Sequence, residues 1–321
     1  ETCLAAGPSI LFLGSSLAGL GAGILWSSQG SYFAQASKLL AAEGEEKAVT
    51  ARLSGVFAVR YLAWEFAVKL LVSLVQSLQL EGLSIAGVGL LAVVATAVFI
   101  RYEALPGEQE RQPVQRNQVV EKLVSVVALW PEPLIWLLSP TNIAFGFGSA
   151  FMNGYFNAEI TSREVGREFI GTLTACTVAS AALSSSFYSS LGGQYGKGYP
   201  LALGAFAFLC TMCVTATQMS GWKAGILVAY VLWGLGRGSY ESVNRAVVAD
   251  MYPGKTTDAA FANFAFQQCT AASMAYFSLH PRVSISVTIA CACLTMPFYW
   301  LAKQLQTQSP EEESERRYLM E

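Results

Sequence analysis

Two side chains of opposite charge lie within one long apolar segment of this chain, residues 224–248. Arg237 and Glu241 are four residues apart, so on a helix their side chains are one turn apart and can form an ion pair. Asn244 and Val248 continue the same helical face. An ionisable group near the centre of a membrane costs roughly 2.5–3.5 kcal/mol on insertion scales, so such groups usually face protein or a wet cavity.

The helical face that carries Arg237 and Glu241 could bind an ion or carry a proton. If it lines a central pathway, Arg237 can attract an anionic group and Glu241 can carry a proton. The alternative is a static buried bridge between the two, which would specify packing more than it stabilises the fold. Further along, Arg245 and Asp250 are expected to anchor the helix at the membrane interface or to bridge to another helix.

A second charged pair, Glu65 and Lys69, has the same spacing within the segment 54–79. It should also face the bundle, either as a mutually neutralised pair that fixes packing or as part of an ion pathway. Gln29 lies near the end of the first apolar segment. Its amide faces water, forms a hydrogen bond across helices, or lines a cavity.

Other residues near these segments have more ordinary expected roles. Trp26 and Tyr32 are predicted to be interfacial anchors rather than substrate contacts. Asn142 and Asn153 could add polar groups to a cavity. Four glycines are predicted to let helices approach closely, as small residues do in membranes: Gly19, Gly23, Gly234 and Gly238.

The sequence gives no support for soluble-enzyme chemistry. It has no phosphate-binding loop, no metal-ligand cluster, no set of nucleophile, base and acid, and no basic nucleic-acid patch. The seven cysteines include a C-x-x-C at Cys210 and Cys213, but no partner motif, so we interpret them as small packing residues. We expect no enzyme activity, no metal, no cofactor and no nucleic-acid partner.

Composition indicates a polytopic membrane protein. Hydrophobic residues make up 53% of the chain and charged residues 13%, against about 25% charged in soluble domains. Apolar segments of about 20 residues predict membrane-spanning helices, and none shows the alternation of a membrane barrel. We predict an all-α bundle with nine spans: 8–33, 54–79, 82–101, 134–156, 169–190, 199–218, 224–248, 258–279 and 284–304.

The placement of lysine and arginine predicts the orientation. With the loop 102–133 in the cytoplasm, 13 of the 20 basic residues fall on the cytoplasmic side, four on the opposite side and three within spans. Residues 117–130 are amphipathic and could lie along the inner membrane surface. The tail 306–321 contains Pro310 and a run of glutamates, and is predicted to be a disordered cytoplasmic end.

The spans divide three and six around the long loop. The chain starts at Glu1, with a span close behind it, which suggests that residues upstream are absent. We therefore expect four regions: a partial N-terminal membrane half at 1–101, the connecting loop at 102–133, a six-helix C-terminal half at 134–305, and the tail at 306–321. A complete nine-helix protein is the alternative, and it predicts a message that begins with Met close to Glu1.

Four sequence blocks resemble a known family. They are GxGAGILWSSQGSY from Gly19 to Tyr32, FGFGSAFMNGYF at 145–156, LGGQYGKGYP at 191–200 and AAFANFxFQQ at 259–268. Together they resemble the uncoordinated-ninety-three-like (UNC-93-like) branch of the major facilitator superfamily. The resemblance implies two six-helix halves, with this chain corresponding to helices four to twelve.

The resemblance supports two functions of different kinds. The first is a secondary transporter, in which two halves rock around a midplane site and move a small molecule or an ion. The second is a non-transporting partner that regulates ion channels or escorts receptors, as members of this family are associated with doing. Both place the protein in the lipid bilayer, without indicating which membrane.

Overall fold

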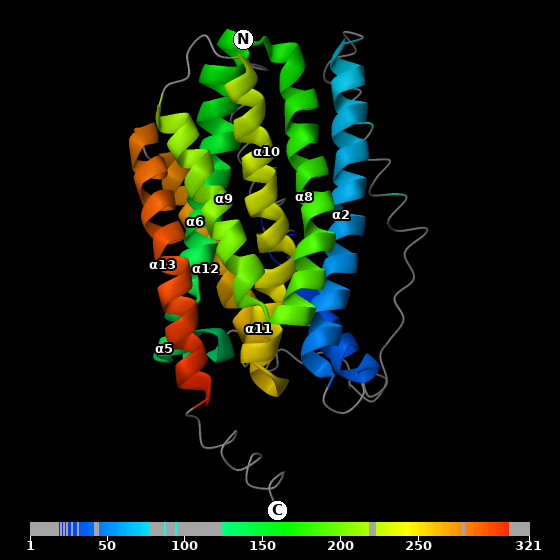
Figure 1. Ribbon diagram of the computed structural model, residues 1–321, viewed down its shortest axis with the longest axis vertical. Helices are drawn as coiled ribbons and strands as arrows, with labels where there is room; N and C mark the ends of the chain where they lie inside the picture. Colours follow the sequence, from blue (N-terminus) through cyan, green and yellow to red (C-terminus); the bar gives the residue numbers. More distant parts are fainter. Residues whose placement is uncertain are drawn as a thin grey trace, which may run out of the picture.

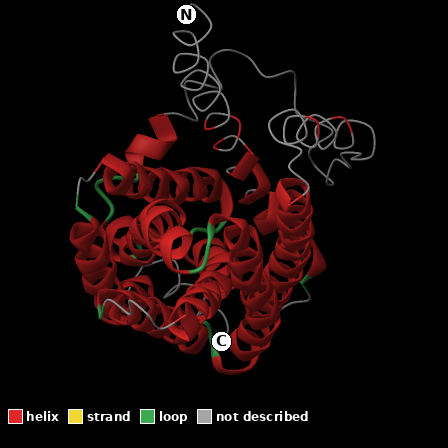
Figure 2. Ribbon diagram, turned by 90° about the horizontal axis from the view of Figure 1, so that it is seen from above, coloured by secondary structure: helices red, strands yellow, loops and turns green. Residues whose placement is uncertain are grey.

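The computed structural model describes residues 32–41, 45–77, 124–217, 223–277 and 280–307, with scattered helical positions at 19–30 and at 87 and 94. Every regular element within these residues is helical. The helices run roughly along the long axis of the molecule (Figure 1) and form one bundle when seen from above (Figure 2). The predicted all-α membrane bundle is confirmed.

Five helices are continuous and long. As helices, they satisfy most of their backbone hydrogen bonds within the segment. They are α2 (Glu46–Ser77), α8 (Ile170–Tyr195), α9 (Gly198–Ala216), α12 (Thr257–Phe277) and α13 (Pro281–Thr307).

Two further helical rods change geometry along their length. The first contains α5 (Pro133–Leu137), α6 (Ser139–Ala150), the π-helix η1 (Phe151–Thr161) and α7 (Ser162–Glu164). The second contains α10 (Lys223–Ser239), the π-helix η3 (Tyr240–Asn244) and α11 (Arg245–Met251). Short 3-10 turns, η2 (Arg167–Phe169) and η4 (Gly254–Thr256), precede α8 and α12. A π-helix widens the backbone locally, and such segments often occur at functional sites.

The helices agree with the predicted spans, with corrections at several ends. The predicted span 54–79 begins earlier, since α2 starts at Glu46. The predicted span 134–156 extends to Glu164, because η1 and α7 continue the helix. Residues 306 and 307 belong to α13 rather than to the tail. The rest of the tail, most of the span 82–101 and residues 102–123 lie outside the described residues.

Four helical segments of the described chain are long and apolar enough to cross a membrane by composition alone: Pro133–Glu164, Arg167–Tyr195, Gly198–Ala216 and Pro281–Thr307. α2 and α10 are not among them. Both carry the charged residues singled out above, and these lower the mean hydropathy of their helices. Their charges need the rest of the bundle to be accommodated.

The end of the connecting loop packs against the bundle. Residues 124–128 are helical, and Leu129 is buried in a cluster with Phe261 and Phe264 of α12. Trp130 Nε1 donates to Asn263 Oδ1 at 2.9 Å. Of the predicted surface helix over 117–130, Leu129 and Trp130 thus contact α12, while Val124 and Val127 stay exposed. Its place along the membrane surface stays a prediction.

Candidate functional site

A cavity of about 320 Å³ lies between α2 and the helices of the C-terminal part. Five of the predicted site residues line it together, namely Arg237, Glu241, Asn244, Glu65 and Lys69. They come from α2, α10 and η3, and α6, α8 and α12 close the remaining walls. The helical face proposed for 237–248 is the face that lines this cavity.

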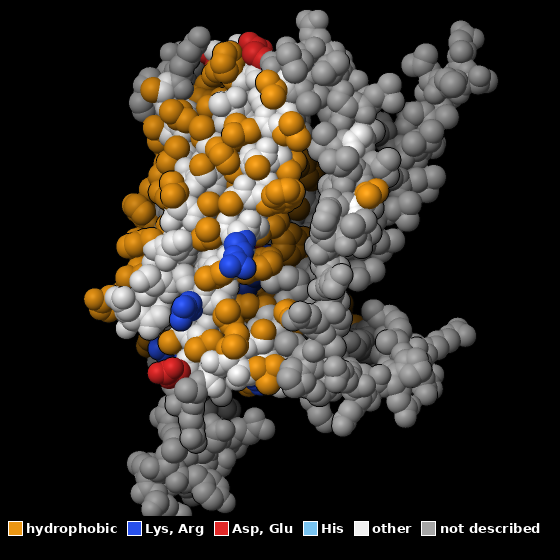
Figure 3. All heavy atoms as spheres, turned by 90° about the vertical axis from the view of Figure 1, so that its right-hand side faces the viewer, with side chains coloured by type: hydrophobic (Ala, Val, Ile, Leu, Met, Phe, Trp, Pro, Cys, Tyr) orange, Lys and Arg blue, Asp and Glu red, His pale blue; other side chains and the backbone are white. Residues whose placement is uncertain are grey.

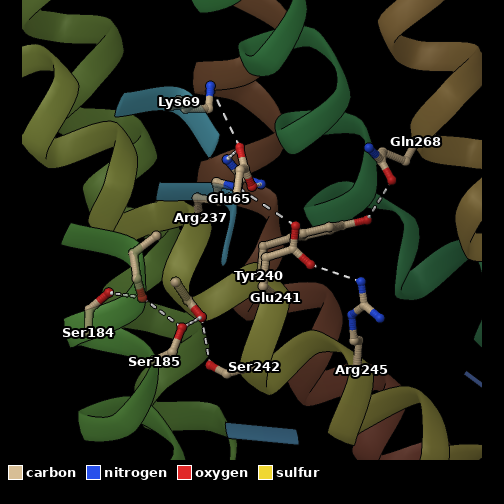
Figure 4. A network of polar contacts seen from close by, with 12 residues as sticks. Glu65, Lys69, Ser184, Ser185, Arg237, Tyr240, Glu241, Ser242, Arg245 and Gln268 are labelled. Carbon is tan, nitrogen blue, oxygen red and sulfur yellow. Dashed lines mark hydrogen bonds and ion pairs between the residues drawn. The ribbon is translucent and has the colours of Figure 1, made fainter. Parts of the chain in front are cut away.

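Arg237 pairs with a carboxylate on another helix. Its Nη1 and Nη2 donate to the two carboxylate oxygens of Glu65 at 3.0 and 2.6 Å (Figure 4). Glu241 Oε1 lies 3.8 Å from Arg237 Nε, which has no hydrogen-bond partner within the described structure. The expected bridge within one helix is therefore the weaker contact, since the planar guanidinium fits a facing carboxylate better than one beside it on the same helix.

Glu241 is bound by an arginine one turn further along the same rod. Arg245 Nη2 donates to Glu241 Oε2 at 2.9 Å, and its Nη1 donates to Gln29 Oε1. Of the three arrangements considered for Gln29, the bond across helices is the one observed. Of the two considered for Arg245, it is the bridge to another helix.

Trp26 is not an interfacial anchor in this structure. It lines the cavity, and the Arg245 guanidinium lies 4.6 Å from the centre of its ring. Its ring also meets Tyr61 edge to face, with centroids 5.2 Å apart. The arginine draws the indole inward, since a cation over an aromatic face is favourable in a partly desolvated site.

Lys69 completes the network on the other side of Glu65. Its Nζ lies 3.6 Å from Glu65 Oε1, as the four-residue spacing predicts. Among the described residues that line the cavity, three cations (Lys69, Arg237 and Arg245) thus meet two carboxylates, Glu65 and Glu241. Fully ionised, this set carries one excess positive charge.

Aromatic rings form much of the rest of the wall, and sequence reasoning did not find them. Phe145 stacks on Tyr240 with centroids 4.0 Å apart and on Trp233 at 5.8 Å. The Tyr240 hydroxyl donates to Gln268 Oε1 at 3.3 Å. Helical spacing could have predicted two of these rings. Trp233 and Tyr240 precede Arg237 and Asn244 by four residues each, so they share the same helical face.

The two asparagines considered as cavity groups have different places. Asn153 lines the cavity, whereas Asn142 is fully buried beside it. Asn142 accepts from Asn244 Nδ2 at 3.0 Å and donates to Gln267 Oε1 at 2.8 Å. Gln267 in turn donates to the carbonyl of Ile135 at 3.3 Å. This amide chain fixes the Asn244 side chain at the cavity wall.

The glycines differ in what they touch. A Cβ on Gly234 would lie 2.7 Å from Ser180 Cβ, and one on Gly238 would lie 2.8 Å from the Ala181 carbonyl oxygen, so α10 meets α8 closely at both points. Gly19 and Gly23 have no described atom within 4 Å of such a Cβ. A packing role for Gly19 and Gly23 stays a prediction.

A separate buried ion pair joins the turn between α8 and α9 to α11. Lys197 Nζ is 2.5 Å from Asp250 Oδ2 and 3.2 Å from the Ala246 carbonyl oxygen. Burial lowers the pKa of Lys197, and the Asp250 carboxylate opposes that shift. No group of three or more His, Cys, Asp or Glu in the described part of the chain could hold a metal ion.

The fold and the cavity define a multi-pass membrane helix bundle with an ionic, aromatic-lined interior. No family model matches the chain. It is 26% identical to protein unc-93 homolog A of Bos taurus over 331 aligned residues, which cover 88% of this chain and 71% of the bovine protein.

Two further relatives have the same name. The chain is 24% identical to protein unc-93 homolog A of Homo sapiens and of Danio rerio. These alignments cover 70% and 65% of this chain but only 50% and 46% of the relatives. These similarities confirm the resemblance to the UNC-93-like family, and the chain is a multi-pass membrane protein.

Proposed function

We propose that this protein is a secondary transporter of the major facilitator type, with a substrate site in the cavity between α2 and the C-terminal helices. The observation that carries this proposal is the Arg237–Glu65 pair, which joins the two predicted halves across that cavity. Alternating access needs contacts between halves that can break and reform around one site.

The charges of the cavity favour an anionic substrate. With both carboxylates ionised, one positive charge is in excess, and an anion would balance it. The volume of about 320 Å³ is at the lower end of small-molecule sites. Stacked aromatic rings would contact an apolar or planar part of such a molecule.

Glu241 is the candidate proton carrier. Its side chain is buried, and it lies between two arginines, at 3.8 Å from Arg237 Nε and 2.9 Å from Arg245 Nη2. Protonation of Glu241 would remove its attraction for both guanidiniums and leave more positive charge for an anion. This arrangement supports a coupling of anion transport to proton movement through Glu241.

The test is flux into liposomes that contain the purified protein and a pH-sensitive dye. A panel of small organic anions is added outside, and dye signal and anion uptake are recorded together. Glu241→Gln should lower coupled flux at least tenfold. The matched control is Glu159→Gln, since Glu159 pairs with Arg163 away from the cavity. Equal flux in Glu241→Gln and the unmodified protein would remove Glu241 from the mechanism.

A second candidate is a non-transporting membrane partner. It is favoured by large apolar side chains on the outer faces of α2 and α8, where Trp64 is 70% exposed and Leu183 78% exposed. Such faces suit lipid or the helices of another membrane protein. Crosslinking in native membranes separates the candidates: a stoichiometric partner without flux supports this one.

A further inference from the structure

A groove of about 620 Å³ runs along the outside of the contact between α2 and α8, apart from the central cavity. α2 contributes Arg52, Val56 and Arg60 to one wall, and these follow each other at four-residue intervals on one face. The opposite wall is the last part of α8, with the exposed hydroxyls of Ser186 and Ser190.

The base of the groove is a tight helix contact. A Cβ on Gly55 would collide with Ser189 of α8, and the Ser189 hydroxyl donates to the Ala51 carbonyl. Gly193, by contrast, has no described atom within 4 Å of such a Cβ. α2 and α8 are therefore in close contact at the base of the groove, while the groove itself is open to the side of the bundle.

Both arginines are exposed, and neither forms an ion pair with any residue of the described chain. The remaining arginines of this region, Arg237 and Arg245, are both paired with carboxylates. The side of the molecule in Figure 3 is largely hydrophobic, and basic side chains stand out in its lower half. Among the residues that the structure describes, Arg52 and Arg60 thus have no acidic partner.

The length of α2 places these arginines relative to the membrane. Its 32 residues span about 48 Å, and the hydrocarbon core is about 30 Å thick. With α2 centred on the hydrocarbon core, about 9 Å of helix extends beyond the core at each end, so Arg52, six residues after the predicted cytoplasmic start of α2, lies at the level of the lipid headgroups. Arg60 lies about 12 Å further in, where an arginine must extend toward the headgroups or pair with an anion.

We infer that this groove binds an anionic phospholipid of the cytoplasmic leaflet. Its phosphate would lie between Arg52 and Arg60 with hydrogen bonds to the serine hydroxyls. Its acyl chains would pack on Val56 and Val59. The two arginines make the groove positively charged, and the groove opens toward the side of the bundle, where lipid would lie. Its anionic occupant should therefore be a lipid, since a soluble partner would not reach the level of Arg60. Guanidinium is well suited to phosphate, which it holds through two parallel bonds.

The experiment measures lipid binding to the purified full chain in detergent, by native mass spectrometry during titration with phosphatidylglycerol, phosphatidylcholine or free glycerol phosphate. The unmodified protein should retain phosphatidylglycerol at least tenfold more tightly than phosphatidylcholine. Free glycerol phosphate should bind weakly, since it lacks acyl chains. Each arginine replaced by glutamine should weaken phosphatidylglycerol binding about fivefold.

The matched control is Arg282→Gln, an exposed arginine at the start of α13, outside the groove. The variant with Arg52→Lys and Arg60→Lys keeps both charges but loses the paired guanidinium bonds, so its phosphatidylglycerol affinity should fall between that of the unmodified protein and that of the variant with both arginines replaced by glutamine. Equal affinity for the two lipids in the unmodified protein would overturn the inference without any variant. An equal loss in Arg282→Gln, or tight binding of glycerol phosphate alone, would overturn it as well.

Discussion

The Arg237 guanidinium holds both carboxylate oxygens of Glu65, at 3.0 and 2.6 Å, across 172 positions of sequence. This contact ties α10 to α2 and therefore joins the six C-terminal helices to the preceding part of the chain. Because both groups are largely enclosed, the pair is better suited to specify how the helices meet than to add stability over an apolar contact.

The first prediction concerns this pair. Glu65→Gln leaves the Arg237 charge with only the longer contact to Glu241, at 3.8 Å, so it should destabilise the protein by about 3 kcal/mol. Arg237→Gln together with Glu65→Gln should cost less than the sum of the single changes, with a coupling energy of about 1–3 kcal/mol. Unfolding of the purified variants in mixed micelles measures this. Additive single effects would mean that the bidentate contact does not form.

A second prediction concerns Lys197 and Asp250. Asp250→Asn removes the carboxylate that opposes the burial effect, so the pKa of Lys197 should fall further below 10.5. The folded state then binds fewer protons than the unfolded state between that lowered pKa and 10.5. The free energy of unfolding of the variant should therefore rise with pH across this window.

The measurement for Lys197 is the melting temperature of Asp250→Asn relative to the unmodified protein at several pH values. The decrease in melting temperature caused by Asp250→Asn should be largest near pH 7 and should become smaller toward pH 10. In the variant that also carries Lys197→Met, the added pH dependence should disappear, because no titrating group remains at this place. A deficit that is independent of pH would contradict the prediction.

Asn142 gives a third prediction. Replacing it by alanine leaves Asn244 Nδ2 and Gln267 Oε1 without the amide that now binds both. Asn142→Ala should therefore cost about 1–3 kcal/mol of stability. Asn153→Ala is the control, since Asn153 lines the cavity, where water can replace it. Chemical unfolding of both variants in detergent compares them, and a larger loss in Asn153→Ala would contradict the role assigned to the amide chain.

The close contact between α10 and α8 gives a fourth prediction. Gly238→Ala puts a methyl group 2.8 Å from the Ala181 carbonyl oxygen, so the helices must separate at a cost of about 1–3 kcal/mol. Gly193→Ala adds the same group where space is open, and should be neutral or stabilise by up to about 1 kcal/mol through helix propensity. The melting temperature should fall in Gly238→Ala, and in Gly193→Ala it should stay the same or rise.

The sequence predicted the features of this protein that depend on local chemistry. Apolar segments of sufficient length must become helices in a bilayer, since no water satisfies their backbone groups, and the described helices occupy seven of the predicted spans. The 237–248 face and the Glu65–Lys69 contact also follow from helical spacing alone. Such relationships need only the geometry of one helix.

Only the tertiary structure decided which charges pair. Spacing favours Glu241 as the partner of Arg237, but the approach and rotation of α2 bring Glu65 closer, and Arg245 then takes Glu241. The same approach turns Trp26 and Gln29 toward Arg245. Contacts between helices depend on how several helices pack at once, and the period of one helix contains no information about its neighbour's rotation. For that reason the ionic residues were predictable one by one, whereas the network that they form was not.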